Sequence, residues 1–244
     1  MKSNKEIKKI AKKAVSISRG KLIGLSLSAI LLGGVNLLLF LFAQAVVLFF
    51  SMGLHSGAFG RGAVIAKYLY ILFAIYLIVS IFAGSFVELG YNRAMLLRLR
   101  EKPIPQGILF YFKSIWFNAL TLRLFMAIRV LLWSVLLIIP GILAMMNYSM
   151  APFLMAQHPK MDPASAIRVS KHLMKGYKPK LAKLILSFAD EIIISILALG
   201  FPFVYVIPRI KMAVAEFYRE RAGLHDEEVR KLQGEPVKEK GEEA

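Results

Sequence analysis

The stretch VLLWSVLLIIPGILAMMNYSMAPFLMAQ, residues 130–157, contains no charged side chain over 28 positions. Three further uncharged runs, of 31, 20 and 17 residues, occupy positions 22–52, 68–87 and 192–208. A helix needs about 20 mostly apolar residues to cross a bilayer. Hydrophobic residues make up 57% of the 244-residue chain, against roughly 45–50% in soluble domains. The sequence therefore predicts an all-α, polytopic membrane protein.

Several kinds of chemistry find no support in the composition. The chain has no cysteine, which excludes disulfides, thiolate metal sites and cysteine nucleophiles. The four histidines (His55, His158, His172 and His225) are scattered without metal-ligand spacing. The glycine-rich GAFGRG, residues 57–62, follows no strand pattern and is typical of a loop between two crossings. We therefore expect no metal and no cofactor.

The distribution of basic residues predicts an orientation. The net charge is +17, and the Lys and Arg residues gather in segments 1–21, 92–113 and 158–183 and from position 209 onward. An excess of Lys and Arg marks cytoplasmic segments. The alternation predicts a multi-pass protein of the cell membrane, with cytoplasmic termini and about six crossings in three hairpins. The expected crossings are 22–50, 64–88, 119–139, 141–157, 181–199 and 202–220. A five-crossing alternative, in which 192–208 crosses alone, remains open.

Two basic amphipathic helices are expected at the cytoplasmic surface. Residues 1–21 begin with the capping box Ser3-x-x-Glu6 and continue with an apolar stripe opposite lysines. In residues 162–176, Asp162 can cap a helix and Pro163 fits its first turn. Residues 22–222 would form the transmembrane domain, and the charged tail 223–244 is predicted to be disordered.

The basic charge lies along membrane boundaries, which favours anionic lipid headgroups over nucleic acid as the partner. The residues predicted to contact headgroups are Lys5, Lys8, Lys9, Lys12, Lys13, Lys171 and Lys175. A homo-oligomer or a membrane-protein partner is also possible.

Two adjacent carboxylates, Asp190 and Glu191, interrupt an apolar run in SFADEIIIS, residues 187–195. If the last two crossings form a hairpin that turns near position 200, Asp190 is level with Lys211, and Glu191 with Arg209. Ten residues at about 1.5 Å each place all four near the midplane of a core of about 30 Å.

Other charges are expected near this set. Arg129 should reach a similar depth from 119–139, whereas Glu88 and Arg123 should lie at the inner face, reached by snorkelling. Charges inside a membrane are either paired for structure or part of a transport site. Both interpretations remain open.

Several elements resemble a known family. They are LGYNRAMLLRLR (residues 89–100), LLIIPGILAMMNYSMAPFLMA (136–156), ASAIRVSKHLMKGYKPKLAKLILSF (164–188) and FVYVIPRIKMAVAEFY (203–218). Together they resemble domain of unknown function 975, uncharacterised integral membrane proteins found mainly in Gram-positive bacteria. The resemblance extends from the N-terminal basic segment to about Tyr218 and implies no activity. A Trp commonly follows the LSF element in that family. Here Ala189-Asp190-Glu191 follows it, which implies that the acidic pair is peculiar to this chain.

These observations favour a non-enzymatic role in membrane assembly, lipid interaction or the response to envelope stress. The alternative is a small transporter or channel built around the midplane charges. An enzyme is the least favoured class, because His158 near Asp162 is the only conceivable acid–base pair and a loop followed by a helix cap explains both residues.

Overall fold

The computed structural model describes residues 2–34, 62–197 and 203–224, and every regular element in these ranges is a helix. This confirms the predicted all-α class for the described residues. The longer helices are α1 (Asn4–Ser16), α2 (Arg19–Leu31), α4 (Gly62–Leu99), α5 (Trp116–Leu136), α6 (Ile138–Tyr148), α7 (Ala151–Gln157), α8 (Pro163–Leu173), α9 (Lys178–Leu186), α10 (Ala189–Leu197) and α11 (Phe203–Leu224). Two short 3-10 turns, η1 (Ile108–Phe110) and η2 (Lys113–Ile115), precede α5.

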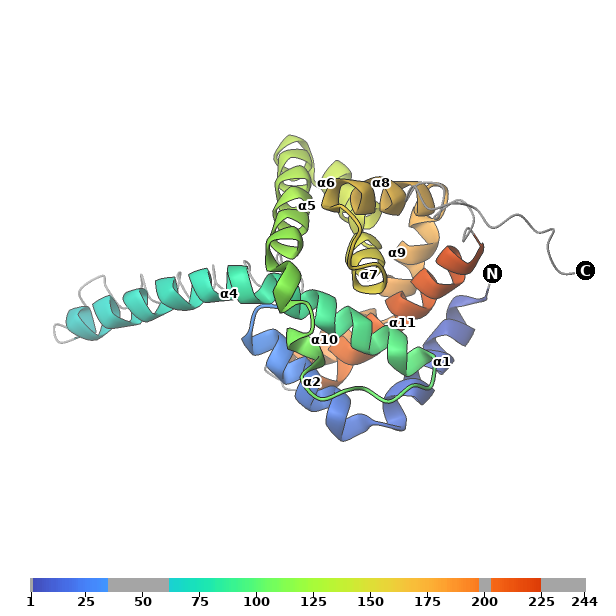
Figure 1. The fold of residues 1–244 in the computed structure, drawn as a ribbon, viewed down its shortest axis with the longest axis horizontal. Helices are drawn as coiled ribbons and strands as arrows, with labels where there is room; N and C mark the ends of the chain where they lie inside the picture. Colours follow the sequence, from blue (N-terminus) through green and yellow to red (C-terminus); the bar gives the residue numbers. More distant parts are fainter. Residues whose placement is uncertain (1, 35–61, 198–202, 225–244) are drawn as a thin grey trace, which may run out of the picture.

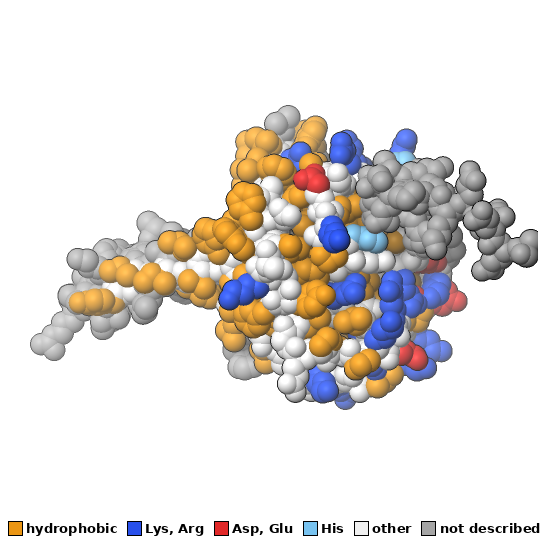
Figure 2. All heavy atoms as spheres, in the orientation of Figure 1, with side chains coloured by type: hydrophobic (Ala, Val, Ile, Leu, Met, Phe, Trp, Pro, Cys, Tyr) orange, Lys and Arg blue, Asp and Glu red, His pale blue; other side chains and the backbone are white. Residues whose placement is uncertain are grey.

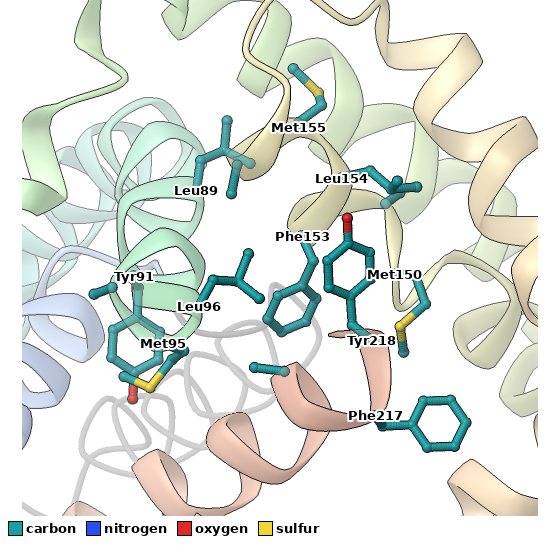
Figure 3. Packing of buried hydrophobic residues seen from close by; sticks show 14 of the residues in the cluster. Leu89, Tyr91, Met95, Leu96, Met150, Phe153, Leu154, Met155, Phe217 and Tyr218 are labelled. Carbon is teal, nitrogen blue, oxygen red and sulfur yellow. The ribbon is translucent and has the colours of Figure 1, made fainter. Parts of the chain in front are cut away.

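The core lies between the C-terminal half of α4, the short helix α7 and the C-terminal half of α11 (Figure 3). Phe153 and Tyr218 stack with ring centroids 5.5 Å apart, and the Tyr218 hydroxyl donates to Gln157 Oε1 at 3.0 Å. The N-terminal half of α4 projects away from this body (Figure 1). With 38 residues, α4 is about 57 Å long.

Helix α1 begins with the predicted capping box. The Ser3 side chain accepts from the Glu6 backbone N–H at 3.3 Å, and the Ser3 backbone N–H donates to the Glu6 carboxylate at 2.7 Å. The apolar stripe of α1 does not face the outside, however. Ile7, Ala11 and Val15 are buried in the core. Most of the stripe therefore packs on protein, whereas Ile17, directly after the helix, is exposed. An amphipathic pattern specifies an apolar neighbour without specifying which one.

Helix α2 ends in a Schellman motif. Gly33 has a φ of +70°, in the left-handed region that glycine adopts at little cost. Its N–H donates to the Ile30 carbonyl at 3.0 Å, and the Gly34 N–H donates to the Ala29 carbonyl at 2.7 Å. This turn leaves the Gly33 carbonyl pointing at α5, where it accepts a hydrogen bond from Arg123.

Helices α5 and α6 form a hairpin whose turn lies earlier than the expected Pro140-Gly141. The extended residue is Leu137, with φ −160° and ψ 145°, so Pro140 falls in the first turn of α6, where its missing N–H costs little. Gly141 packs directly on Ser134, because a Cβ at Gly141 would lie 2.2 Å from the Ser134 Oγ. Further along, α6 ends at Tyr148 and α7 begins at Ala151, with Pro152 in the first turn of α7.

Two helical stretches of the described residues, Ile108–Val135 and Ile139–Gln157, are long and apolar enough to cross a membrane. The count rises to three if α1 and α2, which meet at a 97° bend, form one span. The two stretches overlap with the expected crossings 119–139 and 141–157, although the first begins 11 residues earlier than expected. The expected crossing 181–199 is divided, because α9 ends at Leu186 and α10 begins at Ala189. Residues 35–50 and most of the predicted tail lie outside the described residues.

Candidate functional site

The buried charge cluster consists of Glu88 on α4, Arg123 on α5 and Lys211 on α11. The residues Glu88 and Arg123 are only 8% and 3% exposed. The Lys211 Nζ lies 4.0 Å from a Glu88 carboxylate oxygen, and the Arg123 Nη2 donates to the Gly33 carbonyl at 2.6 Å. Three helices and the end of α2 therefore bring two bases and one acid together.

Arg123 fits beside α4 because Gly84 has no side chain. A Cβ at Gly84 would lie 2.4 Å from the Arg123 Nη1 and 2.4 Å from the Gly33 oxygen. The Nε and Nη1 atoms of Arg123 are buried and have no hydrogen-bond partner. Asn92, one turn after Glu88, is fully buried, and neither atom of its amide has a partner. The cluster thus carries one net positive charge and several unsatisfied polar atoms, an arrangement that is costly in a protein interior.

The side chains of Glu88 and Arg123 are buried and do not extend along the bundle surface, as snorkelling would require; that the two residues lie near the inner face stays a prediction. Both side chains point into the helix bundle. The physical reason is the close approach of α2, α4 and α5 at Gly33 and Gly84, where the α2 carbonyl offers Arg123 an acceptor that the sequence does not reveal.

The peripheral charge cluster consists of Lys8 on α1, Glu191 on α10 and Arg209 on α11. Arg209 Nη1 lies 2.7 Å from one Glu191 oxygen, and Lys8 Nζ lies 3.8 Å from the other. The Lys8 ammonium also donates to the Ser187 carbonyl and lies 4.4 Å from the centre of the Phe188 ring. All three charged side chains are partly exposed.

The five predicted midplane charges do not form one group. Glu191 pairs with Arg209, as the count from the predicted turn expects. The expected pairing of Asp190 with Lys211 is wrong, since Asp190 is exposed and Lys211 approaches Glu88 instead. Adjacent helical residues point about 100° apart, so the two carboxylates cannot both face α11. Arg129 lies over the Phe125 ring at 5.5 Å, apart from both clusters.

A third ion-pair site was not predicted. Glu216 on α11 is buried, with Lys2 Nζ at 2.6 Å and Arg219 Nη2 at 2.8 Å. The Lys2 backbone N–H also donates to the Glu220 carboxylate. The sequence feature that could have predicted this site is the acidic Glu216 inside the otherwise apolar run AVAEFY, residues 213–218. These contacts fasten the start of α1 to the C-terminal half of α11.

The predicted headgroup lysines separate into two groups. Lys8 turns inward to Glu191, and the others lie on the surface. The exposed members are Lys5, Lys9, Lys12, Lys13, Lys171 and Lys175. Figure 2 shows Lys and Arg side chains on the body of the molecule and hydrophobic side chains along the projecting part of α4 and on α5.

The only acid–base pair that the sequence offered has a structural explanation. The Asp162 carboxylate accepts from the backbone N–H groups of Ala164 and Ser165 at 3.0 and 3.1 Å, which makes it the N-cap of α8. Among the described residues, no group of three His, Asp or Glu side chains could hold a metal ion.

Residues 107–223 match the family described as "Protein of unknown function (DUF975)". This part of the chain belongs to that family. The match confirms the resemblance seen in the sequence, but it begins at Gly107 and leaves out residues 89–100. No curated protein and no solved structure matches the chain.

Both charge clusters join the DUF975 region to the residues before it. In the buried charge cluster, Glu88 precedes the region and Arg123 and Lys211 belong to it. In the peripheral charge cluster, Lys8 precedes it and Glu191 and Arg209 belong to it. The N-terminal helices and the DUF975 region therefore form one body held partly by charge.

Proposed function

We propose that the protein is a multi-pass protein of the cell membrane, with a non-enzymatic role in membrane assembly, lipid interaction or the response to envelope stress. The observation that carries the proposal is the extent of apolar side chains exposed on α4 and α5. They include Ile71, Ile75, Ile78 and Val79 on α4, and Ile128, Leu131, Leu132 and Val135 on α5. Soluble monomers rarely expose contiguous apolar patches larger than roughly 300–600 Å².

The exposed lysines of α1 support an anionic lipid as the partner. Lys5, Lys9, Lys12 and Lys13 project from a helix whose apolar stripe is mostly buried. Attraction to anionic headgroups is therefore electrostatic, at about 1 kcal/mol for each basic residue near the surface.

Bound lipid tests this role. The full-length protein would be extracted in mild detergent from membranes of defined composition, and the retained phosphatidylglycerol and phosphatidylethanolamine would be measured by mass spectrometry. We expect enrichment of the anionic lipid, and a several-fold loss of it when the four exposed lysines of α1 are changed to Gln. The matched variant with four Arg keeps the charge and should keep the lipid. An unchanged lipid ratio in the Gln variant contradicts the proposal.

A small transporter or channel is the second candidate, favoured by the buried charge cluster. The Arg123 guanidinium has N–H groups without partners deep in the bundle, and charges at such places commonly mark ion or substrate paths. Flux of small anions into proteoliposomes should then be lost in Arg123→Gln and retained in Arg129→Gln. Absence of flux with the unaltered protein removes this candidate.

A further inference from the structure

Helix α10 and the start of α11 form a hairpin that is too short to cross a bilayer from its charged base. α10 has nine residues, Ala189–Leu197, and six residues of α11, from Phe203 to Pro208, precede Arg209. Glu191 and Arg209 lie 2.7 Å apart, so the 17 residues between them, 192–208, must leave the base and return to it. Each direction has at most about nine residues, of which the described six are helical at about 1.5 Å per residue, so this segment cannot reach across a hydrocarbon core of about 30 Å. The two helices pack against each other.

The depth of the hairpin is set by the helix that its base contacts. Lys8 of α1 lies beside Glu191, donates to the Ser187 carbonyl and contacts the Phe188 ring. The 13-residue α1 carries six charged side chains, and four of its lysines are exposed. Such a helix cannot lie in hydrocarbon, where each charge costs several kcal/mol. Glu191 and Arg209 therefore lie at the level of the headgroups.

The rest of α11 follows α1 away from the membrane core. Glu216 pairs with Lys2 at 2.6 Å, and Glu220 accepts from the Lys2 backbone. Thus α11 runs beside α1 from Arg209 to Glu220 and carries charges along that length. The expected crossing at 202–220 would place these charges in lipid.

The side chains beyond the base have the opposite character. Ile193, Ile194 and Leu197 on α10 are 56%, 59% and 78% exposed, and Tyr205 on α11 is 57% exposed. The hairpin is therefore charged where it joins the body and apolar on its outer surface beyond that point.

We propose that α10 and the first two turns of α11 form a re-entrant hairpin, which enters one leaflet from the cytoplasmic side and returns to that side. Its partner is the acyl-chain region of that leaflet. The inference rests on the proposed membrane location and replaces the crossings expected at 181–199 and 202–220. The predicted pairing of Glu191 with Arg209 is retained, but the inference puts this pair at the level of the headgroups and not at the midplane.

Single cysteines in the cysteine-free chain distinguish the two arrangements. The full-length variants Asp190→Cys and Leu197→Cys would be treated in cells and in inside-out vesicles with a membrane-impermeant maleimide. Both native side chains are exposed, so neither substitution disturbs the core. Lys9→Cys gives the reference labelling rate of an exposed position on α1. Ile194→Cys is a second apolar position on α10 and serves as an independent check on Leu197→Cys.

The re-entrant arrangement predicts that D190C reacts from the cytoplasmic side at a rate near that of K9C, and that L197C and I194C react from neither side. Reaction of L197C from outside, with D190C protected, shows a full crossing and overturns the inference. Reaction of all positions from the cytoplasmic side shows a hairpin outside the bilayer and also overturns it. Alkaline carbonate extraction of the same membranes separates this failure from that of the proposed function, which fails only if the protein is released.

Discussion

The two charge clusters have the same composition and differ in how their charge is neutralised. Each contains two bases and one acid. In the peripheral charge cluster, Glu191 is the centre and both bases lie within 4 Å of it. In the buried charge cluster, Glu88 is 4.0 Å from Lys211, and the hydrogen bond of Arg123 goes to a backbone carbonyl at the end of α2. The negative end of the α2 dipole thus acts there in place of a second carboxylate.

Removing the acid of the buried charge cluster should have the largest effect. In Glu88→Gln, the buried Arg123 and the partly buried Lys211 remain without an anionic partner, so the free energy of unfolding should fall by about 3 kcal/mol. Thermal unfolding in detergent, followed by circular dichroism, measures the change. Glu101→Gln, at an exposed position between α4 and η1, is the control and should be neutral. A neutral Glu88→Gln would show that the two bases do not depend on the Glu88 carboxylate.

Adding one methyl group tests whether the carbonyl contact requires Gly84. Gly84→Ala places a Cβ 2.4 Å from the Arg123 Nη1 and the Gly33 oxygen and should cost about 2 kcal/mol. Gly24→Ala is matched, because nothing lies within 4 Å of a Cβ there; it should stabilise α2 by about 0.5–1 kcal/mol. Equal unfolding midpoints for the two variants would mean that the end of α2 does not approach α4 at Gly84 as closely as the structure shows.

Removing the acid of the peripheral charge cluster should have a smaller effect. Glu191→Gln should destabilise the protein by about 1.5 kcal/mol, because solvent screens these partly exposed charges. Its neighbour supplies the control: Asp190→Asn removes an exposed acid and should change stability by less than about 0.5 kcal/mol. Similar losses of stability in both variants would support the original prediction that Asp190 and Glu191 both pair with bases on α11.

The smallest effect is expected at the start of α1, which presents Lys8 to its cluster. Ser3→Ala removes the N-cap and should cost about 1 kcal/mol, seen as faster hydrogen exchange of α1 amides. Hydrogen bonds from the Ser3 backbone and side chain lower the pKa of Glu6. A carboxyl group with a lowered pKa stabilises the folded state at pH values above its pKa in the unfolded chain. This stabilisation is lost as the pH falls through the pKa of the folded state.

The difference in exchange between Ser3→Ala and the unaltered protein should therefore shrink in acid. Glu6→Gln keeps a hydrogen-bond acceptor without the charge. Hydrogen exchange of its α1 amides should therefore depend less on the protonation of residue 6 in acid than exchange in the unaltered protein does. A difference that is constant across the acid range would show that the carboxylate of Glu6 takes no part in the cap.

Local features were predictable because they depend on a few consecutive residues. The capping box at Ser3 and Glu6 and the cap at Asp162 form as their spacing indicates. The pairing of Glu191 with Arg209 follows from counting along two antiparallel helices. The Gly84 contact could not be predicted, since a glycine in a helix does not reveal which neighbour approaches it.

The sequence by itself determined the all-helical class, the uncharged runs, the helix caps and the exclusion of thiol chemistry. Only the tertiary structure decided that Lys211 approaches Glu88, that Lys8 approaches Glu191, and that most of the stripe of α1 packs on protein. The physical reason is helix rotation. Position along a helix sets the height of a side chain, whereas its direction changes by about 100° per residue and is set by the packing of helices far apart in the sequence.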